Sequence, residues 1–309
     1  MSGSPPTAGG RLHPGAVLLV SAALAINALI SIWLARVSHG WLPVQASDAA
    51  PYVDDLFALE TGIGCFIFLG CLAVLLWTVL LRRAPKYDLV DGDPIEGNTW
   101  LEVVWTLIPL LVVILISAHA INVNGTLDTL GGKQRVRGTD EALATAPSSG
   151  GTIEVIARQW SWEFVYPSGV RSAELHLPCG ERADLRLVSM DVLHGFYVPA
   201  FRLKQDLIPG SVIAYSFTPT REGRYRLRDS MFSGGYMAAN QSDVVVESPA
   251  SYGRWLEEAA RQPLRPSRNA AAELYQRRIR SGDRGWATVP PAPPPLVNVD
   301  RDPDAVHEA

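Results

Sequence analysis

The sequence predicts a membrane-anchored α+β protein, in which apolar helices near the N-terminus precede an outer domain built from β-strands. Residues 1–121 contain three long apolar segments, and residues 152–247 alternate apolar with polar side chains in short runs. The mean hydropathy is slightly positive, +0.10, because the apolar residues are concentrated in those three segments. A length of 309 residues leaves room for about two domains.

The three apolar segments, at 16–35, 56–81 and 103–121, are each long enough to cross a bilayer, which takes about 20 residues. The first belongs to a region, 1–46, that is either a retained transmembrane span or a signal peptide. It is longer than the roughly 7–15-residue apolar core of a signal peptide, which favours a retained span. The other two segments predict a two-helix transmembrane hairpin within residues 47–121.

A basic cluster lies in the short connection between the second and third apolar segments, and consists of Arg82, Arg83 and Lys86. Cytoplasmic loops of membrane proteins carry an excess of Lys and Arg, so this connection is expected in the cytoplasm. The third segment then leads outward, and everything after it lies outside. The predicted location is the bacterial inner (cytoplasmic) membrane, crossed several times, with a large periplasmic domain.

The outer part divides into three regions. Residues 122–150 are rich in Gly, Ser and Thr and predict a linker. Residues 151–250 contain six strand-like runs separated by turn residues, a pattern typical of a β-sandwich or barrel. Residues 251–309 predict a short helix at 252–262, a second helix at 270–280 and a Pro-rich, disordered tail. Within the strands, His176 is expected at the surface.

Composition argues against several kinds of site. Cys65, Cys71 and Cys179 have the spacing of neither a disulfide framework nor a zinc site, and the sequence contains no C-x-x-C-H motif for covalent haem. A net charge of −4 gives no indication of a nucleic-acid partner. Residues 122–309 contain 22 acidic and 22 basic side chains, so their overall charge would not attract a basic protein partner.

Four passages occur in an order and spacing that resembles subunit II of the haem–copper terminal oxidases. They are G-N-T-W-L-E-V-V-W-T-L-I-P (97–109), Q-W-S-W-E-F-V-Y-P (159–167), H-G-F-Y-V-P-A-F-R-L-K-Q-D-L-I-P-G (194–210) and R-E-G-R-Y (221–225). The resemblance covers about residues 50–260. It implies a transmembrane helical hairpin followed by a periplasmic cupredoxin-like β-sandwich.

In copper-carrying members of that family, a loop with the pattern C-S-E-x-C-G-x-x-H-x-x-M joins an upstream histidine to hold a two-copper centre. On this sequence the two bridging cysteines fall on Asp229 and Ser233. The loop histidine falls on Met237 and the methionine on Asn240. Only the upstream histidine, His194, is kept, so these positions are interpreted as the remains of a copper site.

The resemblance therefore implies a chain without a metal or other cofactor of its own. The family's loop glutamate, which contributes to metal binding at the subunit interface, falls on Met231, and no cysteine follows Cys179. Two thiolates are needed to bridge two copper ions, and oxygen or thioether side chains do not replace them. Haems and copper are expected in the partner, subunit I.

Quinol oxidases of the same superfamily have a subunit II of this fold without copper, and their electrons enter subunit I from a membrane quinol. The resemblance thus implies a non-catalytic subunit of a proton-translocating respiratory terminal oxidase, of quinol type, assembled with subunits I and III. One alternative is a cytochrome c oxidase subunit II with a degenerate copper site, since 194–210 looks more like those enzymes. Another is a stand-alone membrane-anchored cupredoxin-like binding module.

The resemblance also suggests roles for single residues. Glu102 occupies the position of a carboxylate at the cytoplasmic mouth of a proton channel of subunit I, and a carboxylate at the membrane boundary can collect protons. Trp160 matches the tryptophan through which electrons enter the domain, although a structural role is expected without copper. Trp162 is expected in the core or at the subunit interface, and Lys204 and Asp206 at the interface.

Overall fold

The computed structural model describes residues 14–81, 87, 97–131, 134–136, 151–282, 285, 287–302 and 304–307. Contacts divide the chain into a membrane unit, Met1–Trp41 with Asp54–His119, and an outer unit, Leu42–Val53 with Ala120–Ala309. The basic cluster of Arg82, Arg83 and Lys86, on which the predicted orientation depends, lies outside the described residues.

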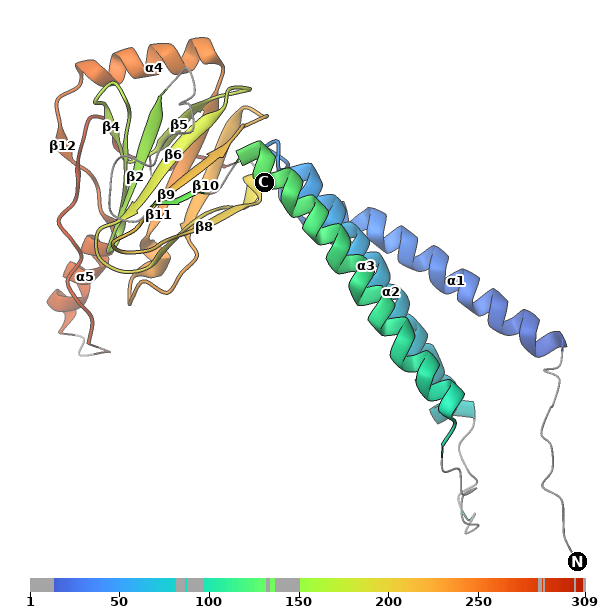
Figure 1. The fold of residues 1–309 in the computed structure, drawn as a ribbon. Coiled ribbons are helices and arrows are strands. Elements are labelled where there is room, and N and C mark those ends of the chain that lie inside the picture. The colour runs from blue at the N-terminus through green and yellow to red at the C-terminus, as the bar shows by residue number, and fades with distance from the viewer. Residues whose placement is uncertain are drawn as a thin grey trace, which may run out of the picture. The chain divides into compact units, whose positions relative to one another are not determined.

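Three long helices carry the apolar segments (Figure 1). They are α1 (Pro14–Ser38), α2 (Ala50–Leu81) and α3 (Thr99–Gly131), and each is long and apolar enough to cross a membrane. Helix α3 continues into the region 122–150 that was predicted to be a linker, so that part of the prediction is wrong. Polar side chains do not end the helix here, because Thr126 and Thr129 donate their hydroxyl groups to carbonyls of the preceding turn.

Helix α1 packs on α2 through small side chains. The amide of Asn27 donates a hydrogen bond to the carbonyl of Phe66 at 2.9 Å. A Cβ added at Gly62 would lie 3.1 Å from the Cβ of Ala35, so the two backbones approach as closely as they do in small-residue contacts between membrane helices. That α1 is a retained span stays a prediction, which the mass of the mature protein tests.

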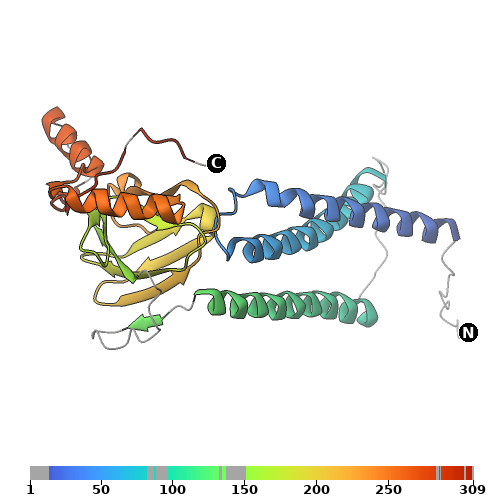
Figure 2. The same cartoon turned by 90° about the horizontal axis from the view of Figure 1, so that it is seen from above.

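The outer unit contains the predicted β-sandwich (Figure 2). One sheet has six strands in the order β1-β9-β6-β2-β3-β4 and the other has five in the order β5-β11-β10-β7-β8. All neighbouring strands run antiparallel except the pairs β2–β6 and β5–β11. The strands are β1 (Gln134–Val136), β2 (Thr152–Arg158), β3 (Ser161–Val165), β4 (Arg171–Ser172), β5 (Leu175–Pro178), β6 (Ala183–Ser189), β7 (His194–Val198), β8 (Leu203–Leu207), β9 (Val212–Phe217), β10 (Gly223–Asp229) and β11 (Gln241–Glu247).

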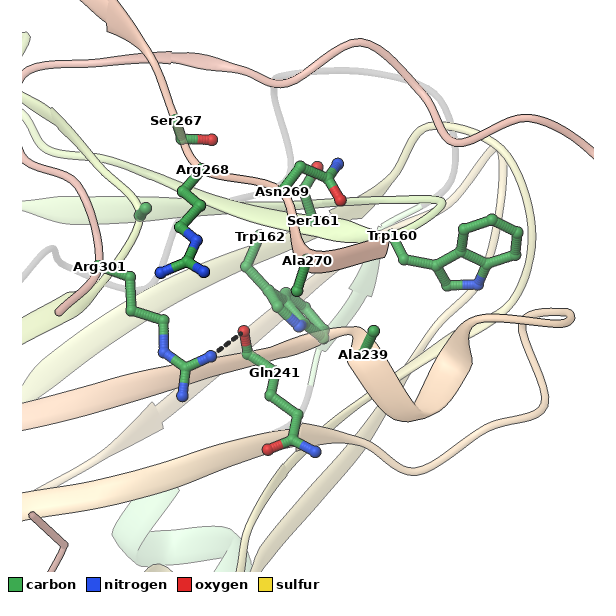
Figure 3. Close-up of a pocket in the computed structure, with 11 residues that line it drawn as sticks. Trp160, Ser161, Trp162, Ala239, Gln241, Ser267, Arg268, Asn269, Ala270 and Arg301 are labelled. Carbon is green, nitrogen blue, oxygen red and sulfur yellow. Dashed lines mark hydrogen bonds between the residues drawn. The ribbon is translucent and has the colours of Figure 1, made fainter. Parts of the chain in front are cut away.

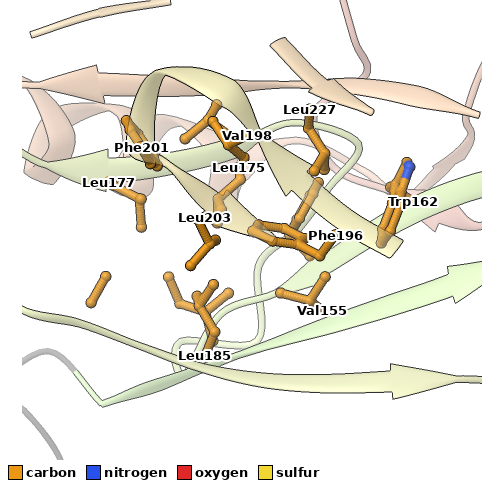
Figure 4. Close-up of a cluster of buried hydrophobic side chains, with 14 of the residues drawn as sticks. Val155, Trp162, Leu175, Leu177, Leu185, Phe196, Val198, Phe201, Leu203 and Leu227 are labelled. Carbon is orange, nitrogen blue, oxygen red and sulfur yellow. The ribbon is translucent and has the colours of Figure 1, made fainter. Parts of the chain in front are cut away.

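Alternate residues of the strands build the core between the sheets (Figure 4). In β2 and β6 every second side chain is buried, as the two-residue period of a strand requires. Val155 pairs with Leu187 in the neighbouring strand, and both are fully buried. Trp162 is also buried and packs edge-on against Phe196 with ring centroids 6.0 Å apart. Trp162 therefore serves the core of the domain.

The helices predicted at 252–262 and 270–280 are present as α4 (Pro249–Arg261) and α5 (Ala270–Ser281). The Pro-rich tail after them was predicted to be disordered but lies against the sandwich, so this part of the prediction is wrong. After α4, the chain forms β12 (Arg265–Pro266), α5 and β13 (Leu296–Val297), with β12 paired to β13. Next, Asn298 and Val299 exchange backbone hydrogen bonds with Arg171 and Ala173. Proline cannot continue a helix, but it does not prevent extended chain from binding at a sheet edge.

His176 is buried, contrary to its predicted place at the surface. Its ring stacks on Trp255 of α4 with centroids 3.9 Å apart and planes 8° apart. The imidazole also lies 3.1 Å from the carboxylate of Glu247 and 3.4 Å from that of Glu174. The amphipathic helix α4 thus covers β5, which the alternation of the strand alone could not reveal.

Candidate functional site

The remnant copper positions are brought together at one end of the five-stranded sheet. His194 begins β7 and Asp229 ends β10, and these two strands are antiparallel neighbours. The loop after Asp229 returns to β11, which pairs with the other side of β10, so Asn240 lies beside Asp229. Ser233, from the middle of the loop, also reaches the same carboxylate. Four of the six positions deduced from the resemblance therefore meet in space.

His194 lies between two carboxylates. Its Nδ1 is 2.7 Å from Asp229 Oδ2 and its Nε2 is 2.8 Å from Asp191 Oδ1. Two acceptors require two N–H donors, which only the protonated imidazolium supplies. Burial by itself lowers the pKa of His194, but the hydrogen bonds to Asp191 and Asp229 outweigh burial and raise this pKa to about 8.

Asp229 is the centre of the hydrogen-bond cluster. One oxygen, Oδ2, accepts from Ser233 Oγ at 2.8 Å and from Asn240 Nδ2 at 2.9 Å, besides facing His194. The other oxygen, Oδ1, accepts from the backbone N–H groups of Gly195 at 2.8 Å and Met231 at 3.1 Å. Burial raises the pKa of Asp229, and these hydrogen bonds, led by the one from His194, lower it below its usual value overall.

Gly195 allows the loop to approach β7. A Cβ at this position would lie 2.1 Å from Ser230 Oγ and 3.0 Å from the backbone nitrogen of Met231. The same close approach lets Ser230 donate its N–H to the carbonyl of Gly195 at 3.1 Å. Only glycine fits between the strand and the loop here. The sequence contained this residue within the H-G-F motif, but nothing in the motif alone indicated its steric role.

Two tryptophans donate hydrogen bonds to backbone carbonyls of the loop at 230–240. Trp160 Nε1 donates to the carbonyl of Ser233 at 3.2 Å, and Gln159 Nε2 donates to the same oxygen at 2.7 Å. Trp162 Nε1 donates to the carbonyl of Asn240 at 3.3 Å. The middle and the end of the loop are thereby attached to β3 and the turn before it. Gln159, Trp160 and Trp162 thus fix the loop by hydrogen bonds.

Trp160 is also covered by the C-terminal part of the chain. Only 2 % of its surface is exposed, and Tyr236 packs edge-on against it at 5.2 Å. The adjacent Gln159 accepts a backbone hydrogen bond from Ala292 at 2.5 Å. A Cβ on Gly235 would lie 2.9 Å from Thr288 Oγ1, so the Pro-rich segment runs directly over this loop. No motif or alternation in the sequence predicted that these segments lie against Trp160 and the loop.

The other residues singled out from the sequence lie apart from this cluster. Met237 begins a short 3-10 helix, η4 (Met237–Ala239), and is partly exposed, as is Met231. Lys204 and Asp206 lie on β8, the edge strand of the five-stranded sheet, with Lys204 exposed. Glu102 is exposed in the first turn of α3, where Asn98 caps the helix by accepting from the N–H of Leu101 at 3.1 Å.

A copper centre does not fit these side chains. Copper sites of this kind are built from thiolate and imidazole ligands, whereas the loop offers carboxylate, hydroxyl, amide and thioether groups. Both nitrogens of His194 face carboxylates, so neither has a lone pair available to a metal. Across the part of the chain that the structure describes, no three His, Cys, Asp or Glu side chains are arranged to hold a metal ion.

Comparison with known proteins identifies the family. The model of the cytochrome c oxidase subunit II transmembrane domain matches residues 38–123, and that of its periplasmic domain matches residues 170–248. A cytochrome c oxidase subunit 2 from Thermostichus vulcanus is 32 % identical over 82 % of this chain and 89 % of its own length. The chain belongs to the cytochrome c oxidase subunit II family. The predicted transmembrane helices and cupredoxin-like outer domain of a subunit II are thereby confirmed.

Subunits II of both functional types are among the relatives of this subunit II. The quinol oxidase subunit 2 of Bacillus cereus is 24 % identical over 62 % of this chain and 64 % of its own length. The solved periplasmic domain of subunit II of cytochrome oxidase from Bradyrhizobium japonicum is 23 % identical, covers 34 % of this chain and 90 % of its own, and has a TM-score of 0.33. A haem–copper terminal oxidase dimer contains a chain, also 23 % identical, that covers 47 % of this one and 98 % of its own, with a TM-score of 0.36.

Proposed function

We propose that this subunit II belongs to a respiratory terminal oxidase that oxidises quinol, and that its outer domain carries no copper centre. The observation that carries the proposal is the buried contact between His194 and Asp229. In the family pattern these two positions are ligands of the same metal centre. Here a cation and an anion occupy them and bind each other, so the loop keeps its shape without a metal.

The cover over Trp160 supports the same proposal. A protein that delivers electrons through this tryptophan must come close to its ring, but Tyr236 and the C-terminal segment lie against it and leave 2 % of its surface exposed. The acidic and basic side chains of residues 122–309 balance, so the outer part has no excess negative charge to attract a basic cytochrome. Quinol delivers its electrons within the membrane, so a quinol oxidase needs neither an accessible Trp160 nor an acidic outer surface.

In this proposal the chain itself is not catalytic. Oxygen would be reduced at the haem–copper centre of subunit I, with subunit III completing the assembly. The roles left to subunit II are to stabilise subunit I, to cover its periplasmic side and to assist proton uptake at Glu102. That residue stands exposed at the start of α3, the end that the positive-inside argument assigns to the cytoplasm.

One observation favours a second candidate, a cytochrome c oxidase subunit II whose copper site has degenerated. The relative that is 32 % identical bears the name cytochrome c oxidase subunit 2, whereas the quinol oxidase relative is 24 % identical. Such a chain would need another route for electrons from cytochrome c into subunit I. The stand-alone binding module is the weaker alternative, because both the transmembrane and the periplasmic regions match an oxidase subunit.

Oxygen consumption by the purified complex tests the proposal. The rate should be high with a short-chain quinol and at background with reduced cytochrome c. Asp229→Asn provides an internal check, since a residue outside the electron path should leave the quinol rate unchanged in complexes that assemble. Rapid oxidation of cytochrome c would reject the proposal in favour of the second candidate. If the chain copurifies with no other oxidase subunit, both oxidase assignments fail.

A further inference from the structure

A second polar site lies between β3 and the start of α5 (Figure 3). It is a cavity of about 140 Å³. Trp162 and Ser161 line it on the sandwich side, and Arg268, Asn269 and Arg301 line it on the side of the C-terminal segment. On the same scale one water needs roughly 10–15 Å³, so the cavity has room for a small polyatomic ion together with water.

Among the residues that the structure describes, two hydrogen-bond donors of this cavity are buried without a partner. Asn269 caps α5, and its Oδ1 accepts from the N–H of Ala272 at 3.0 Å. That contact fixes the orientation of the amide, so Nδ2 is the end left unpaired, in a residue that is only 6 % exposed. The Ser161 hydroxyl is also buried without a partner. Buried polar groups are normally satisfied, and two such donors beside one cavity indicate a missing acceptor.

Charged side chains around the same space are paired with one another. Arg268 and Arg301 each have a carboxylate partner, Glu273 for the first and Asp243 for the second. Asp300 lies nearby as well, and accepts from the backbone N–H of Arg268 at 2.9 Å. The N-terminus of α5, a helix of 12 residues, adds a partial positive charge. The polar groups that remain unpaired at the cavity are thus the donors of Asn269 and Ser161.

We propose that this cavity binds a small oxyanion of the phosphate or sulfate class. Its oxygens would accept from Asn269 Nδ2 and Ser161 Oγ, and the N-terminus of α5 would favour its negative charge. The anion would connect the sandwich to the segment that covers Trp160, because Ser161 follows Trp160 directly and Asn269 begins α5. This proposal does not depend on which electron donor the oxidase uses.

Titration of the detergent-solubilised full chain with inorganic phosphate tests the proposal, with ionic strength held constant by sodium chloride. Trp160 and Trp162 line the cavity, so their fluorescence should change and reach saturation. Hydrogen exchange at the start of α5 should slow in parallel. Sulfate should compete with phosphate. Acetate should bind more weakly, because it has two acceptor oxygens in one plane and not four in a tetrahedron. A response that follows chloride equally, or that never saturates, would overturn the proposal.

Substitutions that retain the helix cap distinguish a binding site from a structural cavity. Asn269→Asp keeps a good N-cap residue but replaces the Nδ2 donor with a negatively charged oxygen, and should weaken phosphate binding at least tenfold. Ser161→Ala should weaken it less. Arg277→Gln, on the outer part of the same helix, is the matched control and should bind like the unmodified chain. Equal affinity in Asn269→Asp and Arg277→Gln would show that the cavity is not the binding site.

Discussion

Nδ1 of His194 lies 2.7 Å from Oδ2 of Asp229, and neither side chain is exposed to solvent. Asp191 holds the other nitrogen of the ring, so a single imidazolium is neutralised from both sides. The loop that follows Asp229 is attached to this pair through Ser233 and Asn240. Charge pairing and hydrogen bonds thus hold this loop against β7 and β10.

Loss of the Asp229 carboxylate should destabilise the outer domain strongly. In Asp229→Ala the imidazolium keeps one partner, and several buried donors lose theirs, which typically costs about 3–5 kcal/mol. Denaturant unfolding of the full chain in detergent, followed by tryptophan fluorescence, measures this change. Glu257→Ala, at a side chain that is 76 % exposed on α4, is the control and should change stability by about 0.5 kcal/mol or less. Similar values for the two variants would contradict a stabilising cluster.

Stability of the outer domain should decrease as the solution becomes alkaline. His194 has a pKa of about 8 in the folded state, above the value of about 6.5 for a free histidine. Its contribution is therefore complete below pH 6.5 and is lost as the pH rises through 8, a change of about 2 kcal/mol. Unfolding free energies between pH 6 and 9 should show this loss, and His194→Gln should flatten the profile. An equally steep profile in that variant would assign the effect to other groups.

Copper should not form a two-metal centre in this chain. Copper added in excess to the full chain should produce no mixed-valence electron paramagnetic resonance signal, since the loop lacks both thiolates. Asp229→Cys alone should not produce it either, because one thiolate cannot bridge two ions. The smallest set expected to restore the centre is Asp229→Cys, Ser233→Cys and Met237→His together. A stoichiometric two-copper signal in the unmodified chain would contradict the ligand argument.

Removal of the Glu102 carboxylate should slow proton uptake by the oxidase. Glu102→Gln should lower turnover several-fold with normal haem content, and Glu102→Asp should have a milder effect. The backbone cap of α3 comes from Asn98, so neither substitution should prevent assembly. Glu60→Gln, near the other end of the hairpin, is the matched control and should turn over normally. Unchanged turnover and pH dependence in Glu102→Gln would leave Glu102 a role only at the helix start.

Helix α1 should remain in the mature protein as a transmembrane span. The mass of the purified chain should include residues 14–38, because Asn27 and Ala35 are used in contacts with α2. A reporter fused after Ala84 should be active in the cytoplasm, and one fused after Gly150 in the periplasm. A mature N-terminus near Ala46 would identify the first segment as a signal peptide, and reversed reporters would reject the orientation.

The sequence was informative where a pattern repeats along the chain. Apolar length predicted the three membrane helices, and two-residue alternation predicted strands such as β2 and β6. The positions of His194, Asp229, Ser233 and Asn240 could be deduced because a family motif specifies their spacing. The second carboxylate beside His194 could not be deduced, because Asp191 lies outside that motif and its contact with His194 depends on the path of the chain between β6 and β7.

Contacts between residues that are distant in the sequence were not predicted where the segments have no periodic pattern. The segment around Ala292 is rich in proline and has no alternation, so composition suggested disorder, yet it binds beside Gln159. His176 was expected at the surface of a strand, but it stacks on Trp255, which lies in a different element. In each case the decisive partner is distant in sequence, and a single sequence carries no signal for such pairs.

Asp243, which is fully buried in β11, is paired with Arg224 inside the sheet and with Arg301 and His307 outside it. Both outer partners follow every strand of the two sheets in the sequence. A chain cut before Arg301 would therefore keep all the strands of the sandwich but lose two contacts to this buried carboxylate.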